Sequence, residues 1–237
     1  SVNASGTGLA STDSFATGAL GQLFDSAHAG TRSLNIAAPL TNASLSGVGY
    51  ITDYLVSYGA AASGSITPKT LTATAPTITG TTSRTYDGLV TAPGASLSGG
   101  SVSGFVGADS GSLDTSGIGL AYNSAHVATA TTIAASGAVV LSFTGSANGT
   151  GSGIGAGNQV AGLASDYAYT APTIASVAGT ITAKTLTATA PTITGTTSRP
   201  YDGLVTAPGA SLTGGSVSGF VGADSGSLDT SGIGLAY

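Results

Sequence analysis

Short stretches in which polar and apolar residues alternate recur along the whole chain, separated by Gly, Pro or Asn. In residues 69–74 (KTLTAT), for example, threonines alternate with Leu71 and Ala73. Because successive side chains of a β-strand point to opposite faces, this alternation predicts a strand with one buried face. Glycine interrupts almost every window, so no stretch sustains the 3.6-residue period of an amphipathic helix.

Five further segments are short, β-branched or alternating, and bounded by turn residues, which is typical of strands. They are 76–82 (PTITGTT), 100–106 (GSVSGFV), 117–122 (GIGLAY), 138–144 (AVVLSFT) and 173–177 (TIASV). This spacing of strands and turns predicts an all-β fold of tandem β-sandwich-like modules in an elongated array. A β-solenoid is the alternative, and it is disfavoured because the repeat described next is far longer than one solenoid coil.

Internal repetition defines the organisation of the chain. Residues 69–122 recur as residues 184–237, an offset of 115 residues (184 − 69), with only Thr85 replaced by Pro200 and Ser98 by Thr213. A weaker copy of the second half of the repeat comes first: residues 24–31 (FDSAHAGT) parallel residues 122–129 (YNSAHVAT). We therefore expect the chain to have been cut from a longer array.

The predicted boundaries are the C-terminal part of one repeat, a complete repeat and the N-terminal part of a third. They span residues 1–66, 67–182 and 183–237, respectively. The complete repeat is longer than its N-terminal counterpart, and the surplus is expected in a glycine-rich loop insertion at residues 144–158.

Composition narrows the classes of function. Charged residues make up 6% of the 237 residues, against roughly 25% in typical soluble domains. Hydrophobic residues make up 41% and the net charge is −5, which favours a folded chain over a disordered one. Five scattered Lys and Arg residues argue against a nucleic-acid partner, and no apolar run reaches the roughly 18–20 residues of a membrane span. The absence of Cys excludes disulfides and thiolate metal sites.

An Arg-x-Tyr-Asp-Gly motif holds much of the little charge present. Its residues are Arg84, Tyr86, Asp87 and Gly88 in the first copy, and Arg199, Tyr201, Asp202 and Gly203 in the second. Asp-Gly is a favoured centre for a tight hairpin, and Arg and Asp are near enough in sequence to pair across the corner. We interpret the motif as a structural turn, with a ligand-binding corner as the alternative.

The order of motifs resembles the YDG-type repeats of bacterial secreted and surface exoproteins, including filamentous-haemagglutinin-like adhesins. The likeness runs from KTLTAT through R-x-Y-D-G and GFVGADSGSL to F/Y-x-SAH-x-x-T, and ends at the Asp-Tyr pairs 53–54 and 166–167. It departs at Arg84 and Arg199, where members often have Lys, and at Gly107-Ala108-Asp109, where Gly-Asp is usual. The resemblance implies a secreted, extracellular β-module of the bacterial cell surface, without enzymatic activity.

Three chemical alternatives attach to individual residues. The GADSGS loop at 107–112 with His126 could suggest a serine nucleophile and its base, but His28 and His126 occupy equivalent repeat positions, which favours a scaffold role and no enzyme. Asp109 and Asp114, which recur as Asp224 and Asp229, are candidate ligands of a weak Ca²⁺ site. The interpretation that we favour is that these aspartates cap turns. No cofactor is expected.

The two lysines, Lys69 and Lys184, occupy the same repeat position. An isopeptide bond to Asn or Asp is one interpretation, and a salt bridge or an exposed charge at a strand edge is the favoured one.

Together these features predict a structural, non-catalytic repeat region of a bacterial extracellular surface protein, which forms a stalk, fibre or biofilm-matrix filament. Its expected partners are neighbouring repeats or copies of itself. The alternative function is an adhesin module that binds surface glycans or a host or neighbouring cell. Such sites usually expose aromatic clusters, and aromatic residues here are only 6% of the chain and scattered.

Overall fold

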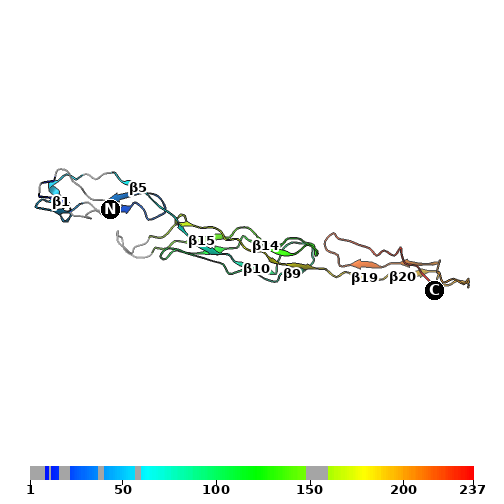
Figure 1. Ribbon diagram of the computed structural model, residues 1–237. Coiled ribbons are helices and arrows are strands. Elements are labelled where there is room, and N and C mark those ends of the chain that lie inside the picture. Colours follow the sequence, from blue (N-terminus) through cyan, green and yellow to red (C-terminus); the bar gives the residue numbers. More distant parts are fainter. Residues whose placement is uncertain (1–8, 11, 16–21, 37–39, 57–59, 148–159) are drawn as a thin grey trace. The chain divides into compact units, whose positions relative to one another are not determined.

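The computed structural model (Figure 1) describes residues 9–10, 12–15, 22–36, 40–56, 60–147 and 160–237. The loop insertion expected at 144–158 therefore lies outside the described residues from position 148 onward. The chain divides into two compact units, each built from three separate segments. The first unit comprises Ser1–Ala75, Gly100–Gly117 and Ala138–Thr173, and the second comprises Pro76–Gly99, Ile118–Gly137 and Ile174–Tyr237.

The protein is all-β, as the sequence predicts. Within the described residues the regular elements are short strands and three single 3₁₀ turns, and each sheet has two or three strands. Each segment predicted to form a strand contains one, from β6 and β7 in KTLTAT to β17 at the end of TIASV. No helix in the described part of the chain is long and apolar enough to cross a membrane.

In its described residues, the first unit contains one three-stranded antiparallel sheet and four strand pairs. The sheet has the order β2(Gln22–Phe24), β3(Gly30–Ile36), β5(Ala62–Ile66). The antiparallel pairs are β1(Ser14–Phe15) with β4(Leu45–Ser46), β7(Thr72–Thr74) with β11(Ser101–Ser103), and β12(Ser110–Asp114) with β15(Val140–Thr144). The fourth pair, β6(Lys69–Thr70) with β16(Tyr167–Ala168), is parallel. The 3₁₀ turns are η1(Asn42–Ser44), η2(Ile51–Asp53) and η3(Ala164–Asp166).

Three aromatic rings pack against one another in the first unit, beside β12 and β15. The ring centroids of Phe105 and Tyr167 are 5.4 Å apart, and those of Phe143 and Tyr167 are 5.3 Å apart. Gly111, in β12, is opposite Phe143, and a Cβ atom there would lie 2.7 Å from the ring of Phe105. Glycine is therefore required at position 111 to let the ring of Phe105 approach the strand.

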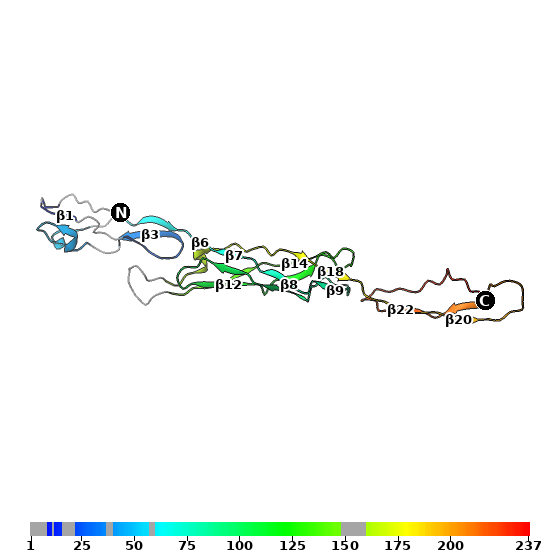
Figure 2. The ribbon, with the colours of Figure 1, turned by 60° about the horizontal axis from the view of Figure 1, so that its bottom comes forward.

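The second unit has the same elements of sheet structure in other segments. Its three-stranded antiparallel sheet has the order β13(Gly119–Tyr122), β14(Thr132–Ser136), β17(Val177–Ala178). The antiparallel pairs are β8(Thr77–Gly80) with β10(Ala95–Ser98), β19(Thr187–Thr189) with β22(Ser216–Ser218), and β20(Thr192–Gly195) with β21(Ala210–Thr213). β9(Ser83–Thr85) and β18(Thr180–Thr182) form a parallel pair (Figure 2).

The core of the second unit surrounds Ile133, which is fully buried. Its other buried members are Ile78, Ala92, Tyr122, Ala130 and Ile181. Gly179 closes this core, because a Cβ atom at that position would lie 2.6 Å from Cγ1 of Ile133. Burial of an aliphatic side chain of this size contributes roughly 1.5–3 kcal/mol to the free energy of folding. The few large aliphatic residues of this core therefore contribute more to stability than the many small side chains around them.

The two nearly identical sequence copies differ in how many strands they form. The copy at 69–122 forms the pairs β7–β11 and β8–β10, and the copy at 184–237 forms the corresponding pairs β19–β22 and β20–β21. The counterparts of β6, β9, β12 and β13 are not strands in residues 184–237. The partners of those four strands, β16, β18, β15 and β14, come from the sequence that follows Tyr122. A repeat is therefore completed by pairing its first half with its second half.

The three-stranded sheets support the weak sequence match at the N-terminus. In β2–β3–β5 and in β13–β14–β17, the SAH sequence lies in the connection between the first and second strands. In each connection a serine hydroxyl, that of Ser26 or Ser124, accepts a hydrogen bond of 3.1 Å from the backbone N–H of the histidine two residues later. The same local turn thus recurs in the two copies.

Candidate functional site: the YDG corners and the aspartate–tyrosine pairs

The first YDG corner, residues 84–88, begins in β9. This strand places Arg84 at the edge of the second unit's core. The Arg84 guanidinium forms an ion pair with Asp87 and donates to the carbonyl oxygen of Thr91. It also lies 6.0 Å from the centroid of the Tyr122 ring. The arginine side chain is 12% exposed and the aspartate 47%, so the pair is half in water and fixes geometry more than it adds stability.

The Asp-Gly step does not join the two strands of a hairpin, contrary to the hairpin geometry expected from the sequence. β9 pairs in parallel with β18, and the strand before it, β8, pairs with β10 beyond the corner. Gly88 has φ +80°, which L side chains rarely adopt, and the carboxylate of Asp87 accepts a 3.0 Å hydrogen bond from the N–H of Leu89. The corner is thus an aspartate-capped bend within the long connection between β8 and β10.

The second YDG corner, residues 199–203, has the same ion pair and the same bend, but its arginine donates to a different carbonyl oxygen. Arg199 and Asp202 form an ion pair of 2.5 Å, and Arg199 donates to the carbonyl oxygen of Leu204. Its guanidinium lies 5.5 Å from the ring centroid of Tyr237, the counterpart of Tyr122. Gly203 has φ +76°. The arginine–aspartate pair expected at each corner is present in both.

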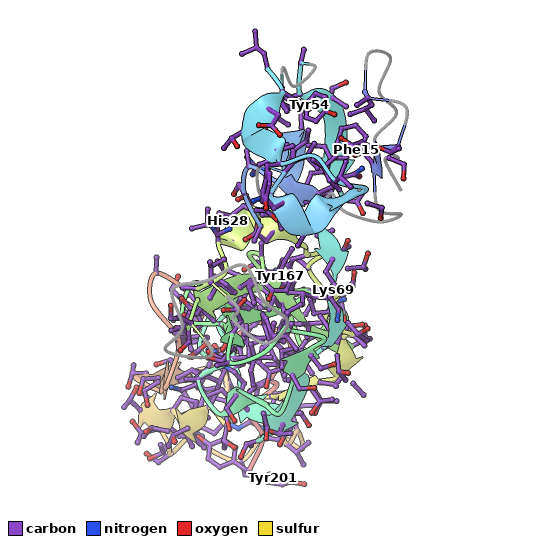
Figure 3. The ribbon with its side chains drawn as sticks, turned by 90° about the vertical axis from the view of Figure 1, so that its left-hand side faces the viewer. Phe15, His28, Tyr54, Lys69, Tyr167 and Tyr201 are labelled. Carbon is purple, nitrogen blue, oxygen red and sulfur yellow. The ribbon has the colours of Figure 1, made fainter. Side chains whose placement is uncertain are left out.

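The tyrosines of the two corners have different environments. Tyr86 packs against the core of the second unit, and its hydroxyl donates to Oδ2 of Asp224 at 3.2 Å. This hydrogen bond raises the pKa of Tyr86 above its usual value. Tyr201 is 98% exposed and extends away from the ribbon in Figure 3. The core against which Tyr86 packs includes Ala130, Ile133 and Ile181, which belong to the second half of the repeat.

A second polar arrangement, in the first unit, joins the GADSGS loop to the Asp-Tyr sequence at 166–167. The Tyr167 hydroxyl donates to Oδ2 of Asp109 at 2.6 Å and accepts from the N–H of Val106 at 3.0 Å. Oδ1 of Asp109 accepts from the N–H groups of Ser146 and Gly162, at 2.8 and 3.0 Å. The tyrosine hydroxyl and the two N–H groups hold the pKa of Asp109 below its usual value despite burial. Burial, followed by the bond to Asp109, raises the pKa of Tyr167.

The same pair occurs near the N-terminus, between Asp13 and Tyr54. The Tyr54 hydroxyl donates to Oδ2 of Asp13 at 2.5 Å, and Oδ1 accepts from the N–H groups of Val48 and Gly49. The tyrosine bond, with help from the N–H groups, lowers the pKa of Asp13. Asp13 was not recognised in the sequence as a counterpart of Asp109. The available signal was the shared Asp-Ser dipeptide, at 13–14 and 109–110, upstream of an SAH sequence.

The aspartate of the Asp-Tyr sequence has a different partner, a histidine of the preceding repeat. His28 Nδ1 lies 2.7 Å from Oδ2 of Asp166, and the N–H of Ala29 donates to Oδ1 at 2.7 Å. Arg32 holds this loop by donating to the carbonyl oxygens of His28 and Ala29, at 2.6 and 2.7 Å. Burial raises the pKa of Asp166, but the hydrogen bonds outweigh it and the net shift is downward.

No family model matches the chain, and neither a curated protein nor a solved structure is detectably similar to it. The chemical alternatives are therefore weighed on the geometry. His126 stacks with Tyr86, with centroids 6.5 Å apart. In the described part of the chain no serine hydroxyl is hydrogen-bonded to an imidazole ring. Ser110 itself is in β12, paired with Thr144 of β15.

The aspartates considered as Ca²⁺ ligands have separate roles. Asp109 binds Tyr167, whereas Asp114 caps a turn by accepting from the N–H of Ser116 at 2.9 Å. Asp229 repeats this cap with Ser231 at the same distance. Among the described residues, no group of three or more His or Asp side chains is placed to hold a metal ion. Calcium needs several carboxylate or carbonyl oxygens converging on one point, and the described carboxylates do not converge in this way.

The two lysines form no ion pair with any described residue. Lys69 is in β6, in register with Tyr167 of the parallel strand β16. It lines a cavity of about 280 Å³ together with Asp109 and Asp166, near His28 and Tyr167 (Figure 3). Lys184 lines a corresponding cavity in the second unit, to which Asp224 also contributes.

Proposed function

We propose that the chain is a structural, non-catalytic repeat region of a bacterial extracellular surface protein, and that it builds a stalk, fibre or matrix filament. Neighbouring repeats and copies of the chain itself are its partners. Near-identical repetition at a 115-residue interval supports this role, because an array extends by adding units whose main contacts are with their neighbours.

The observation that carries the proposal is the use made of the few ionisable side chains. Arg84 pairs with Asp87, Asp109 binds Tyr167, and Asp166 binds His28. Each of these carboxylates is engaged by donors within the protein. Each of these contacts fixes a loop or turn, and that of Arg84 recurs at Arg199, as expected of a repeating scaffold rather than of a single active centre.

Electron microscopy tests the proposal directly. Cells that make the protein, labelled with an antibody against the purified chain, should show the label along surface fibres or in matrix material. Purified chain should lack hydrolytic activity towards peptide, ester and glycoside substrates. Label confined to the cytoplasm, or saturable binding of the chain to a defined glycan on an array without any fibre, would contradict it.

A further inference from the structure

Two cavities of the protein, one in each compact unit, are lined by residues at corresponding repeat positions. The first has a volume of about 280 Å³ and the second about 330 Å³. The corresponding pairs are His28 and His126, Ala29 and Val127, Lys69 and Lys184, Val106 and Val221, and Asp109 and Asp224. The same arrangement has thus formed twice, although the sequences around His28 and His126 are only weakly similar.

Each cavity has walls from two different repeats. One wall is the SAH loop, residues 26–29 or 124–127, which belongs to the earlier repeat. The opposite wall is the lysine and the GFVGAD loop, residues 104–109 or 219–224, which belong to the later repeat. The cavities therefore mark the boundary between successive repeats, in the first unit and again in the second.

In the second unit the YDG corner also takes part in this boundary. The hydroxyl of Tyr86 donates to Asp224 of the GFVGAD loop. A Cβ atom on Gly88 would lie 3.3 Å from Cγ1 of Val221, in the same loop. At the second corner a Cβ atom on Gly203 would meet nothing within 4 Å. Glycine at position 88 thus serves both the bend and the close approach of the next repeat's loop.

We propose that the YDG corner and the SAH loop of one repeat together form a docking surface for the GFVGAD loop of the following repeat. The partner is a loop with one valine and one carboxylate: Val221 lines the cavity and lies against Gly88 of the corner, and Asp224 accepts a hydrogen bond from the corner's tyrosine. The Arg-x-Tyr-Asp-Gly motif then connects one repeat to the next.

The docking is compatible with the aspartate–tyrosine pair inside a complete repeat. An ionised carboxylate offers about four acceptor positions. At Asp109, Oδ1 accepts two backbone N–H groups and Oδ2 accepts the hydroxyl of Tyr167. Oδ2 of Asp224 is the atom that accepts from Tyr86. One aspartate can therefore hold the tyrosine of its own repeat and the corner tyrosine of the preceding one.

Hydrogen exchange on the full chain tests this contact, because nearly every change has a matched control in the other copy. The reporter is the backbone N–H of Asp224, which donates to the carbonyl oxygen of Val221 at 3.0 Å. The first pair of variants is Tyr86→Phe and Tyr201→Phe. Loss of one hydrogen bond at the boundary should speed exchange of this amide about fivefold in Tyr86→Phe. Tyr201→Phe should leave it unchanged.

The second pair is Gly88→Val and Gly203→Val. The two glycines have nearly the same backbone, φ +80° and +76°, so the strain of adding a side chain is matched. Only Gly88→Val meets Val221, so only this variant should release residues 219–224 to faster exchange. Equal effects within either pair, or no effect of the two changes at the first corner, would overturn the docking surface.

This inference builds on the proposed function only in assuming that repeats follow one another in an array. The exchange measurement is made on single chains in solution. A protein that forms no fibres can therefore still show the boundary contact, and a fibre-forming protein can lack it, so failure of one proposal is distinguishable from failure of the other.

Discussion

At the scale of single residues, the protein relies on a few buried or half-buried polar contacts of tyrosine with aspartate. Asp109 with Tyr167 and Asp13 with Tyr54 have the same geometry, including two backbone N–H donors to the second carboxylate oxygen. A hydrogen bond to a charged group contributes more than a neutral one, about 1.5–3 kcal/mol. In a chain of mostly small side chains, such contacts hold loops that apolar packing alone would leave loose.

Removal of the Tyr167 hydroxyl should destabilise the protein measurably. In Tyr167→Phe the carboxylate of Asp109 loses a donor and the N–H of Val106 loses its acceptor. We expect the free energy of unfolding to fall by about 1–3 kcal/mol, measured by chemical denaturation. Tyr201→Phe removes the same atom from a side chain that is 98% exposed and should change stability by less than about 0.5 kcal/mol. Equal losses in the two variants would show that the bond to Asp109 is unimportant.

The same pair predicts how stability depends on pH. The pKa of Asp109 is lower in the folded state than its ordinary value of 3.8, so its contribution is complete above that value and is lost as pH falls through the folded-state pKa. The pKa of Tyr167 is raised above 10.0, so its contribution is complete below pH 10.0 and is lost as pH rises through the raised pKa.

We therefore expect a plateau of stability between these limits, with losses in acid and in strong alkali, in denaturation midpoints measured across pH. In Asp109→Asn the plateau should be lower and the acid decline shallower, because the amide does not titrate. An acid decline as steep as that of the unmodified protein would assign it to other carboxylates.

At the scale of elements, the position of strands followed from the sequence but their partners did not. Alternation and turn residues located β7, β8, β11, β13 and β15, because these signals are local. Nothing local distinguishes a strand that pairs with its neighbour from one that pairs nearly 100 residues away, as β9 does with β18. The hairpin expected at Asp87-Gly88 failed for this reason: the turn chemistry was correct, but the flanking segments pair elsewhere.

The two sequence copies show how much the strands of the second half of the repeat contribute to burial of the first half. Ile78 and Ile193 occupy the same place in PTITG, yet Ile78 is 7% exposed and Ile193 is 60% exposed. The difference arises because Ala130, Ile133 and Ile181 join Ile78 in the core of the second unit.

Ile78→Ala should lower the free energy of unfolding by about 2–5 kcal/mol, since it leaves a cavity in the core. Ile193→Ala should change it by less than about 1 kcal/mol, because little of the side chain is buried. Thermal or chemical denaturation of the two variants distinguishes these values. Similar losses would mean that the core around Ile133 does not depend on Ile78.

At the scale of the whole molecule, the spacing of short strands and turns along the entire sequence predicted the all-β class, and the repetition predicted how the chain is organised. The polar contacts that hold the repeats were beyond reach from sequence. His28 and Asp166 are 138 positions apart, and so are Tyr86 and Asp224. Asp109 is noted in the sequence as a turn cap or a Ca²⁺ ligand, but its carboxylate binds the hydroxyl of Tyr167, which the sequence shows only as the end of a motif. A single sequence shows which residues recur and not which recurring residues meet.

The pairing of β9 with β18 also has a consequence for the order in which the protein is made. The residues in register, Ser83 and Thr180, are 97 positions apart (180 − 83), and Lys69 and Tyr167 of β6 and β16 are 98 apart. A growing chain emerges from its N-terminus, so β6 and β9 wait for nearly a whole repeat before their partners exist. Pairings this distant in sequence slow folding. Until its last strands arrive, a repeat can form inner pairs equivalent to β7–β11 and β8–β10, but the segments of β6 and β9 have no partner.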